Sequence, residues 1–167
     1  MPGDFIFDLV SHPWFQRLRN IRQLGLSSYV YPGAVHSRFQ HSLGAMYLTS
    51  LAVNTLRSKG ISITDREEEA VLVAILLHDI GHGPFSHALE HSIIENMPHE
   101  KMSLLIMEEL NRIYDGRLTD AIAVFNGTCP RRFFHDLITG QMDMDRMDYL
   151  RRDSFFTGVI EGSVGAD

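Results

Sequence analysis

The stretch EEEAVLVAILLHDIGHGPFSH, residues 67–87, decides the fold. Three acidic residues open it, where the positive end of a helix dipole favours them, and Ser62 to Asp65 just upstream provide a helix cap. Residues 70–77 are apolar on every side, and no close turn signals bound them as they would a strand. The stretch therefore predicts a helix that is buried all around.

Polar side chains end this apolar helix. His78 and Asp79 follow it directly, and then come Gly81, Gly83 and Pro84. Neighbouring residues of a regular helix diverge by about 100°, so the pair can face one point only where the backbone turns away, a turn that Gly81 allows. The negative end of the helix dipole also favours a bound cation. Imidazole and carboxylate together suit a borderline divalent metal such as Fe, Mn, Co, Ni or Zn.

Histidine is concentrated in this part of the chain. Of nine histidines in the sequence, five lie between residues 78 and 99. His12 and His135 stand apart, and we expect them to be ordinary surface or capping histidines. The cluster requires a different explanation, and metal binding or catalysis accounts for it.

Two ligands hold a metal poorly, and two other segments offer more. His41 lies early in a predicted helix from about residue 37 to 57. Asp143, Asp145 and Asp148 lie in GQMDMDRMDYL, where Asp145 and Asp148 share a helix face and Asp143 is better placed to cap. Two histidines and two aspartates would leave coordination positions open for water and substrate, as in catalytic rather than structural sites.

The remaining patterns are also helical, and we find no convincing strand, repeat or linker. Further helices or short helical segments are predicted at 12–25, 86–96, 98–114, 118–125, 131–140 and 144–153, with a loop at 26–39. The sequence thus predicts one all-α domain over residues 1–167. Because FFTGVIEGSVGAD at the end lacks a helix cap or a core-forming element, we expect the chain to be a fragment of a longer polypeptide.

Composition narrows the class of protein. The chain has 167 residues with 44% hydrophobic and 22% charged residues, as in ordinary globular domains. There is one cysteine, no signal peptide pattern and no apolar run near the ~20 residues of a membrane span. A net charge of −6 argues against general nucleic-acid binding. We therefore expect a cytoplasmic protein that does not insert into membranes.

Four segments together resemble a known family. SRFQHSLGAMYL, LLHDIGHGPFSHALE, PHEKMS and MDMDRMDYLRRD occur in the order found in the HD-domain phosphohydrolases, and they are most similar to the deoxynucleoside triphosphate triphosphohydrolase branch. This resemblance covers about residues 13–158. It implies a helical bundle that holds one or two divalent metals, with the identity open among Fe, Mn, Ni, Co, Zn and Mg.

The resemblance also assigns roles to residues. It implies four metal ligands, namely His41, His78, Asp79 and Asp145. It places His82, His87 and Glu90 near the scissile phosphate, as a general acid or as groups that stabilise developing charge, with His99 and Glu100 just behind them. It places Arg38, Arg146 and Tyr149 against substrate and Asp153 near the sugar. Arg146 stands where relatives often have lysine, which changes the geometry of a phosphate contact.

The implied reaction converts a deoxynucleoside triphosphate to a deoxynucleoside and triphosphate. Relatives are longer, so we expect this chain to be the N-terminal catalytic part, with the C-terminal region of the family absent and a homo-oligomer formed by the full-length protein. One alternative is an HD phosphohydrolase that acts on nucleoside monophosphates or signalling nucleotides. Another is a non-catalytic nucleotide sensor, whose signature would be a degraded ligand set.

Overall fold

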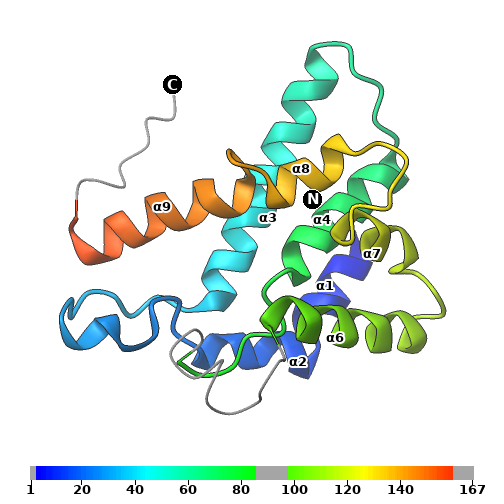
Figure 1. The fold of residues 1–167 in the computed structure, drawn as a ribbon. Helices are drawn as coiled ribbons and strands as arrows, with labels where there is room; N and C mark the ends of the chain where they lie inside the picture. Colours follow the sequence, from blue (N-terminus) through cyan, green and yellow to red (C-terminus); the bar gives the residue numbers. More distant parts are fainter. Residues whose placement is uncertain (1–2, 86–97, 160–167) are drawn as a thin grey trace.

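The computed structural model describes residues 3–85 and 98–159, and their regular structure is helical (Figure 1). The elements are α1 (Asp4–Ser11), α2 (Pro13–Gln16), η1 (Arg17–Asn20), η2 (Gly25–Tyr29), α3 (Arg38–Ser58), α4 (Asp65–Leu77), α6 (His99–Ile113), α7 (Thr119–Phe125), α8 (Phe133–Thr139) and α9 (Met144–Thr157). Within these ranges the only extended pairing is an isolated antiparallel bridge between Arg22 and Ser37. The predicted all-α fold is confirmed, and the helix predicted at 86–96 lies outside the described residues.

Helix α4 forms the centre of the core, as its sequence predicts. Thr64 caps its N-terminus by accepting a hydrogen bond from the backbone of Glu67, whose side chain accepts one from the backbone of Thr64 in return. Every residue from 70 to 77 is buried. The helix packs against α3 on one side and against α7 and α8 on another. Its C-terminal end is therefore fixed inside the bundle, where polar side chains can be held in place.

Helices α3 and α9 pack against each other, and α9 crosses α3 in Figure 1. Helix α3 begins with a capping box made by Ser37 and Gln40 and ends at Lys59, close to the predicted bounds. Helix α9 begins at the cap Asp143 and runs to Thr157, about four residues beyond the predicted end. It stops where Gly158 adopts a left-handed conformation with φ 73°. The packing of these two helices places the start of α3 close to the start of α9.

The N-terminal part departs from prediction in two places. The single helix predicted over 12–25 is wrong: α2 gives way to the 3₁₀ helix η1, and the chain becomes extended at Ile21, whose carbonyl accepts from the amide of Arg38 at 2.9 Å. Gly25, expected to end a helix, instead begins η2 with φ 53°. Helix α1 was not predicted, although its buried Phe5, Ile6 and Leu9 recur at helical spacing.

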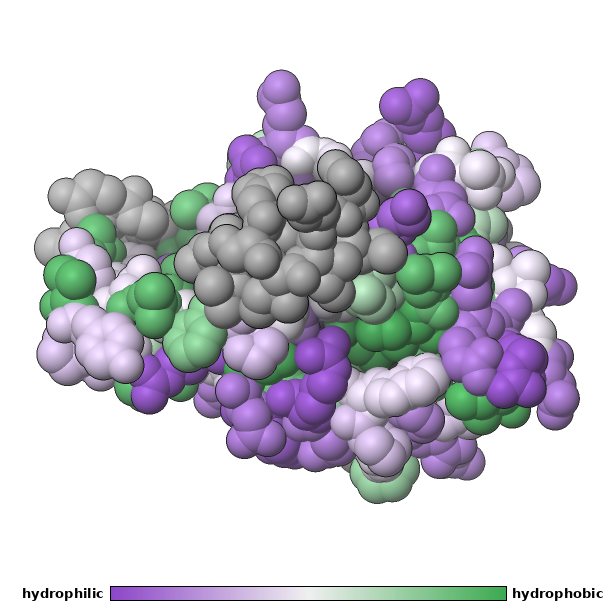
Figure 2. Space-filling view, turned by 60° about the horizontal axis from the view of Figure 1, so that its bottom comes forward, coloured by the Kyte–Doolittle hydropathy of each residue, from purple (hydrophilic) through white to green (hydrophobic). Residues whose placement is uncertain are grey.

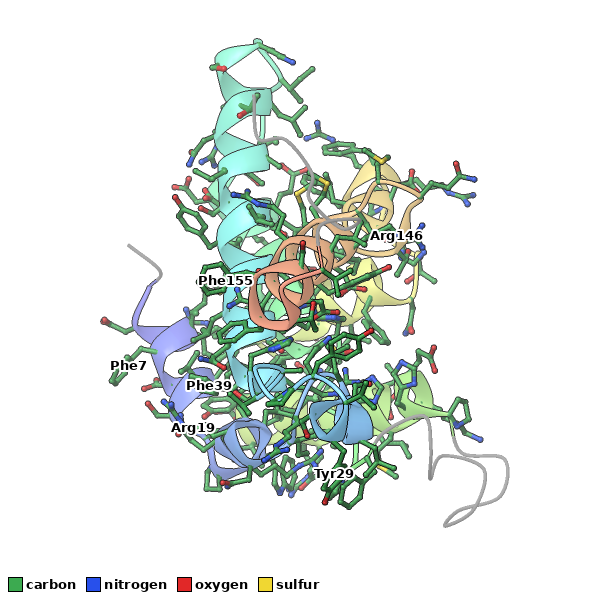
Figure 3. The ribbon with its side chains drawn as sticks, turned by 90° about the vertical axis from the view of Figure 1, so that its left-hand side faces the viewer. Phe7, Arg19, Tyr29, Phe39, Arg146 and Phe155 are labelled. Atoms are coloured by element: carbon green, nitrogen blue, oxygen red, sulfur yellow. The ribbon has the colours of Figure 1, made fainter. Side chains whose placement is uncertain are left out.

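Hydrophobic side chains also reach the surface. Figure 2 shows them gathered in part of one face among hydrophilic residues. The most exposed large ones include Phe7, Tyr29 and Phe155, which Figure 3 labels on three separate elements, α1, η2 and α9. Among the described residues, no helix combines the length and the apolar character needed to cross a membrane.

Candidate metal centre

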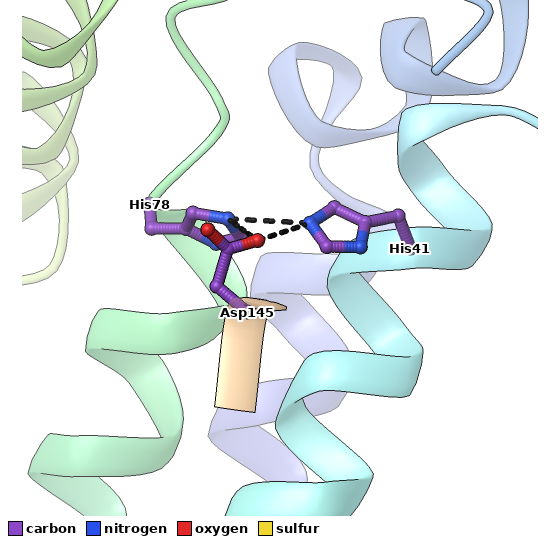
Figure 4. A group of neighbouring side chains, drawn as sticks. All are labelled: His41, His78 and Asp145. Atoms are coloured by element: carbon purple, nitrogen blue, oxygen red, sulfur yellow. Dashed lines mark hydrogen bonds and ion pairs between the residues drawn. The ribbon is translucent and has the colours of Figure 1, made fainter. Parts of the chain in front are cut away.

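Four polar side chains, two from helices α3 and α9 and two from the turn that follows α4, lie close together at the C-terminal end of α4. Nε2 of His41, on α3, lies 2.9 Å from Oδ1 of Asp145, on α9, and 3.4 Å from Nε2 of His78 (Figure 4). Nε2 of His78 lies 3.3 Å from Oδ1 of Asp145. Asp79 adjoins this group, with its two oxygens 3.4 Å from Nε2 of His78 and 3.7 Å from Nε2 of His41, and it forms a neighbouring group of donors with His82 and His99. The four residues that sequence reasoning selected as metal ligands are thus brought together.

Hydrogen bonds fix which nitrogen each imidazole presents to this group. Nδ1 of His78 lies 2.6 Å from the carbonyl of Ile75, and Nδ1 of His41 lies 2.8 Å from Oδ2 of Asp148. A carbonyl or a carboxylate oxygen can only accept, so each Nδ1 carries the proton. In the neutral imidazole the lone pair is then on Nε2, the atom that faces the cluster. Both rings are therefore oriented as metal ligands are, with the outer nitrogen anchored.

The donor set fits a divalent transition metal. Donors that share one metal at about 2.0–2.2 Å lie about 3.0–3.5 Å apart, which matches most of the spacings in this cluster. Two imidazole nitrogens and two carboxylate oxygens suit borderline metals such as Fe, Mn, Co, Ni and Zn. Four protein ligands would leave coordination positions on such a metal open for water and substrate. The residues present fit the metal that their chemistry implies.

Electrostatics favours a cation at the same point. Burial lowers the pKa of His41, but hydrogen bonds to Asp145 and Asp148 and the charge of Asp79 outweigh it and raise the pKa to about 9. Burial raises the pKa of Asp145, but hydrogen bonds from His41 and His78 leave the pKa below its usual range. Without metal, His41 therefore holds a proton near neutral pH and Asp145 holds a negative charge. A bound divalent cation would replace that proton.

The three aspartates near the start of α9 have separate roles. Asp145 alone among them contacts both imidazoles. Asp148 accepts from Nδ1 of His41 and from Arg152, whose Nε and second nitrogen lie 2.8 and 2.6 Å from it, so its oxygens are engaged behind the cluster. Asp143 caps α9 by accepting from the amide of Arg146 at 2.6 Å. Of the three aspartates that helix spacing left open, Asp145 is therefore the one whose carboxylate faces both imidazoles.

A second group of donors adjoins the first. Nε2 of His82 lies 3.2 Å from Oδ1 of Asp79, and the ring of His82 stacks on that of His99 with centroids 3.8 Å apart. Burial lowers the pKa of His82, and the charges of Arg38 and His99 add to this, so that the pKa is about 4 despite Asp79. His82 is therefore neutral near pH 7. Asp79 lies between the two groups and contacts both.

The other predicted site residues have different surroundings. Arg38 is buried and donates to Oδ2 of Asp79 at 2.5 Å, so it lies beside a ligand and not on an open surface. Arg146 is exposed, and Figure 3 shows it at the periphery. Tyr149 is half-buried, and Glu100 is exposed next to His99, with 3.4 Å between its Oε1 and the Nε2 of His99. His87 and Glu90 lie outside the described residues.

Asp153 has a partner that sequence reasoning missed. Its Oδ1 accepts a hydrogen bond from Nε2 of His36 at 2.7 Å. His36 is 1% exposed, its Nδ1 has no hydrogen-bond partner among the described residues, and its ring stacks on Phe156. No local pattern indicates this pair, because His36 lies just before α3 and Asp153 lies on α9, far along the sequence. The isolated histidines behave as expected: His12 caps α2, and His135 bonds to a backbone carbonyl.

Comparison with known proteins gives consistent matches. The sequence profile described as "HD domain" matches residues 38–153. A crystal structure of a phosphohydrolase from Bacteroides thetaiotaomicron superimposes with a TM-score of 0.95 at 58% identity, covering 98% of this chain and 41% of that one. The uncharacterized protein YwfO of Bacillus subtilis is 39% identical over 164 residues, 94% of this chain and 37% of that protein.

A further relative carries a more specific name. The deoxynucleoside triphosphate triphosphohydrolase SAMHD1 homolog of Dictyostelium discoideum is 34% identical over an alignment 177 residues long, gaps included, that covers 93% of this chain and 34% of that protein. The chain thus spans well under half the length of the relatives it matches. The profile match covers more than half of the chain and contains all four converging side chains. The chain belongs to the HD-domain family.

Proposed function

We propose that this protein is a metal-dependent phosphohydrolase that converts deoxynucleoside triphosphates to deoxynucleosides and triphosphate. The observation that carries the proposal is the convergence of the Nε2 atoms of His41 and His78 and Oδ1 of Asp145 at spacings of 2.9–3.4 Å, with oxygens of Asp79 3.4 and 3.7 Å from the two imidazoles. A degraded ligand set would indicate a non-catalytic sensor, and here the set is complete. The name of the Dictyostelium relative, a deoxynucleoside triphosphate triphosphohydrolase homolog, supports a deoxynucleoside triphosphate as substrate.

The proposed ligands are His41, His78, Asp79 and Asp145. A divalent metal, when bound, supplies Lewis acidity toward a phosphate group and lowers the pKa of water to the neutral range. Arg38 donates to Asp79 and so holds that carboxylate in one orientation. The same arginine adds positive charge where a polyphosphate would approach.

Helix α9 supplies a row of side chains for the nucleotide. One face of α9 carries Arg146, Tyr149 and Asp153, which are spaced by three and four residues. The same helix carries Asp145 near its start. The exposed guanidinium of Arg146 is suited to bidentate binding of phosphate. We propose that phosphates contact Arg146 and that the sugar lies farther along α9, toward Asp153.

Two histidines that follow α4 have different roles in the proposed reaction. The neutral His82 beside Asp79 holds a proton on Nε2, the atom that faces the carboxylate, and so serves to orient Asp79. We propose that His87, with Glu90, gives a proton to the leaving sugar oxygen, which is the role expected of a general acid next to the scissile bond.

The test combines elemental analysis with product identification on the full-length protein. We expect one or more divalent metals per chain, and release of triphosphate from at least one of the four deoxynucleoside triphosphates. Chelation should abolish the release, and metal should restore it. Turnover of monophosphates without triphosphates would overturn the assignment of substrate. Tight nucleotide binding without hydrolysis under any metal would overturn the assignment as an enzyme.

A further inference from the structure

The segment that carries three of the proposed site histidines and aspartates is a tight turn, not a helix. After α4 ends at Leu77, the amide of Ile80 donates to Leu77 at 3.0 Å and the amide of His82 donates to Asp79 at 3.1 Å. The carbonyls of residues at the end of a helix have no partner in the helix itself. The backbone of residues 78–82 therefore depends on other elements for its position.

Arg17 bonds to this turn from one side. Its guanidinium donates to the carbonyl of His82 at 2.8 Å and to the carbonyl of Ile80. Arg17 opens η1, more than sixty residues earlier in the sequence, and is half-buried. Burial lowers the pKa of Arg17, yet a guanidinium remains charged at neutral pH, and charge-assisted hydrogen bonds are the stronger kind. One side chain thus fixes the backbone on both sides of residue 81.

Ser103, on helix α6, forms hydrogen bonds to the same turn. Its hydroxyl donates to the carbonyl of His78 at 2.7 Å and accepts from the amide of Gly81 at 2.9 Å. Ser103 is on α6 and has no exposed surface. Gly81 lies so close to α6 that a Cβ there would be 2.3 Å from the carbonyl of His99 and from the amide of Ser103. Glycine is thus required at residue 81 because the backbone of α6 approaches it closely.

We infer that Arg17 and Ser103 are positioning residues, which hold the backbone of residues 78–82 so that His78 and Asp79 present their donor atoms to the metal and His82 faces Asp79. This inference rests on the proposed metal site. Neither residue contacts a donor atom. Both bond to peptide groups of the turn itself, so removing them frees the backbone that carries the ligands. Mutation of a residue that hydrogen-bonds to a metal ligand typically lowers metal affinity 10–100-fold, and we expect a similar effect when a bond to the ligand-bearing backbone is lost.

The first test compares matched arginine variants of the full-length protein. We expect Arg17→Met to weaken metal binding about 10-fold or more, measured by competition with a chromogenic chelator. Arg17→Lys, which keeps the charge and can reach one carbonyl, should lie between. The control is Arg19→Met, because Arg19 is exposed and its guanidinium lies 3.6 Å over the ring of Phe39 (Figure 3). Guanidinium ion at millimolar concentration should restore part of the affinity in Arg17→Ala.

The second test removes the hydroxyl of Ser103. We expect Ser103→Ala to weaken metal binding, whereas Ser58→Ala, which removes an exposed hydroxyl bonded to its own helix, should not. In the metal-free protein the amide of Gly81 should exchange with solvent faster in Ser103→Ala than in the parent. Exchange in the absence of metal reports on the turn itself.

Three outcomes would overturn the inference. One is parental metal affinity in both Arg17→Met and Ser103→Ala. Another is a lower melting temperature with unchanged metal affinity of the folded protein and no rescue by guanidinium, which would indicate a purely structural role. The third is a parent that binds no metal. If the parent binds metal and the variants bind it more weakly, but no nucleotide is hydrolysed, the positioning role stands and the proposed reaction fails.

Discussion

Asp148 holds His41 from behind, with its Oδ2 accepting from Nδ1 of the imidazole at 2.8 Å while Nε2 faces Asp145 on the opposite side of the ring at 2.9 Å. Arg152 donates to both oxygens of Asp148 and keeps that carboxylate in place. The arrangement needs Gly44, because a Cβ there would lie 2.0 Å from Oδ1 of Asp148. One aspartate therefore determines the tautomer of a proposed ligand that another aspartate contacts directly.

Asp148→Asn should weaken metal binding without removing any ligand. The amide can donate to Nδ1 of His41, which would move the ring proton to Nε2 and block the lone pair. We expect metal affinity to fall roughly 10–100-fold, measured by chelator competition at pH 7.5. The control is Asp136→Asn, an exposed residue of α8 whose ion pair with Arg132 is long at 3.8 Å. Parental affinity in Asp148→Asn would show that the tautomer of His41 is set in another way.

His78→Ala and Asp79→Ala should each strip the metal and abolish hydrolysis, because each removes one of four donors. His12→Ala should do neither, since that imidazole only accepts from the amide of Trp14 at the start of α2. Elemental analysis of the purified variants gives the metal content, and product release gives the activity. Stoichiometric metal in Asp79→Ala would remove that residue from the ligand set.

Gly81→Ala should disrupt both the fold and the site. Its methyl group would overlap backbone atoms of α6 that cannot move aside as a side chain can, and overpacking typically costs about 1–3 kcal/mol. Gly83→Ala is a close control, because no atom of the described residues lies within 4 Å of its ideal Cβ. Chemical denaturation compares the two. Equal free energies of unfolding would mean that α6 does not approach Gly81 as closely in solution.

The metal-free protein should lose stability as the pH rises from about 6.5 to about 9. The pKa of His41 is raised to about 9 by the folded environment, so its protonated form stabilises the fold fully below the unfolded value of about 6.5 and progressively less above it. Denaturation of chelated protein across this range gives the slope. His41→Gln should lose less stability over the same range, and an equal loss would assign the slope to other groups.

The local patterns of the sequence predict the fold and the ligands for a physical reason. Capping residues and a run of apolar residues at 70–77 determine α4 without help from distant segments, and His78 and Asp79 follow from where that helix ends. The segment 12–25 is different. There Arg17 bonds to carbonyls near residue 80 and the carbonyl of Ile21 bonds to the amide of Arg38, so contacts across the fold replace helical hydrogen bonds. The spacing of residues within one segment carries no information about such long-range contacts.

The pairing of His36 with Asp153 escaped prediction for the same reason, and it separates two proposed functions of α9. Five residues separate His36 from His41, and five separate Asp148 from Asp153, so two histidine–aspartate pairs link α9 to the start of α3 in antiparallel register. The inner pair supports the proposed metal. The outer pair lies eight residues beyond Asp145, about 12 Å along the helix, which is too far to touch the same ion.

Asp153→Asn should therefore change nucleotide binding and leave metal binding intact, the reverse of Asp148→Asn. The side chain of Asp153 is 22% exposed, and among the described residues a buried imidazole holds one of its oxygens, so the other can accept from a substrate hydroxyl. We expect KM for deoxynucleoside triphosphates to rise several-fold, about 1 kcal/mol for one hydrogen bond, with unchanged metal content. His36→Leu should show the same split in weaker form, because it frees the carboxylate without removing it. Loss of metal in Asp153→Asn would contradict the division of α9 into a metal-binding start and a substrate-binding end.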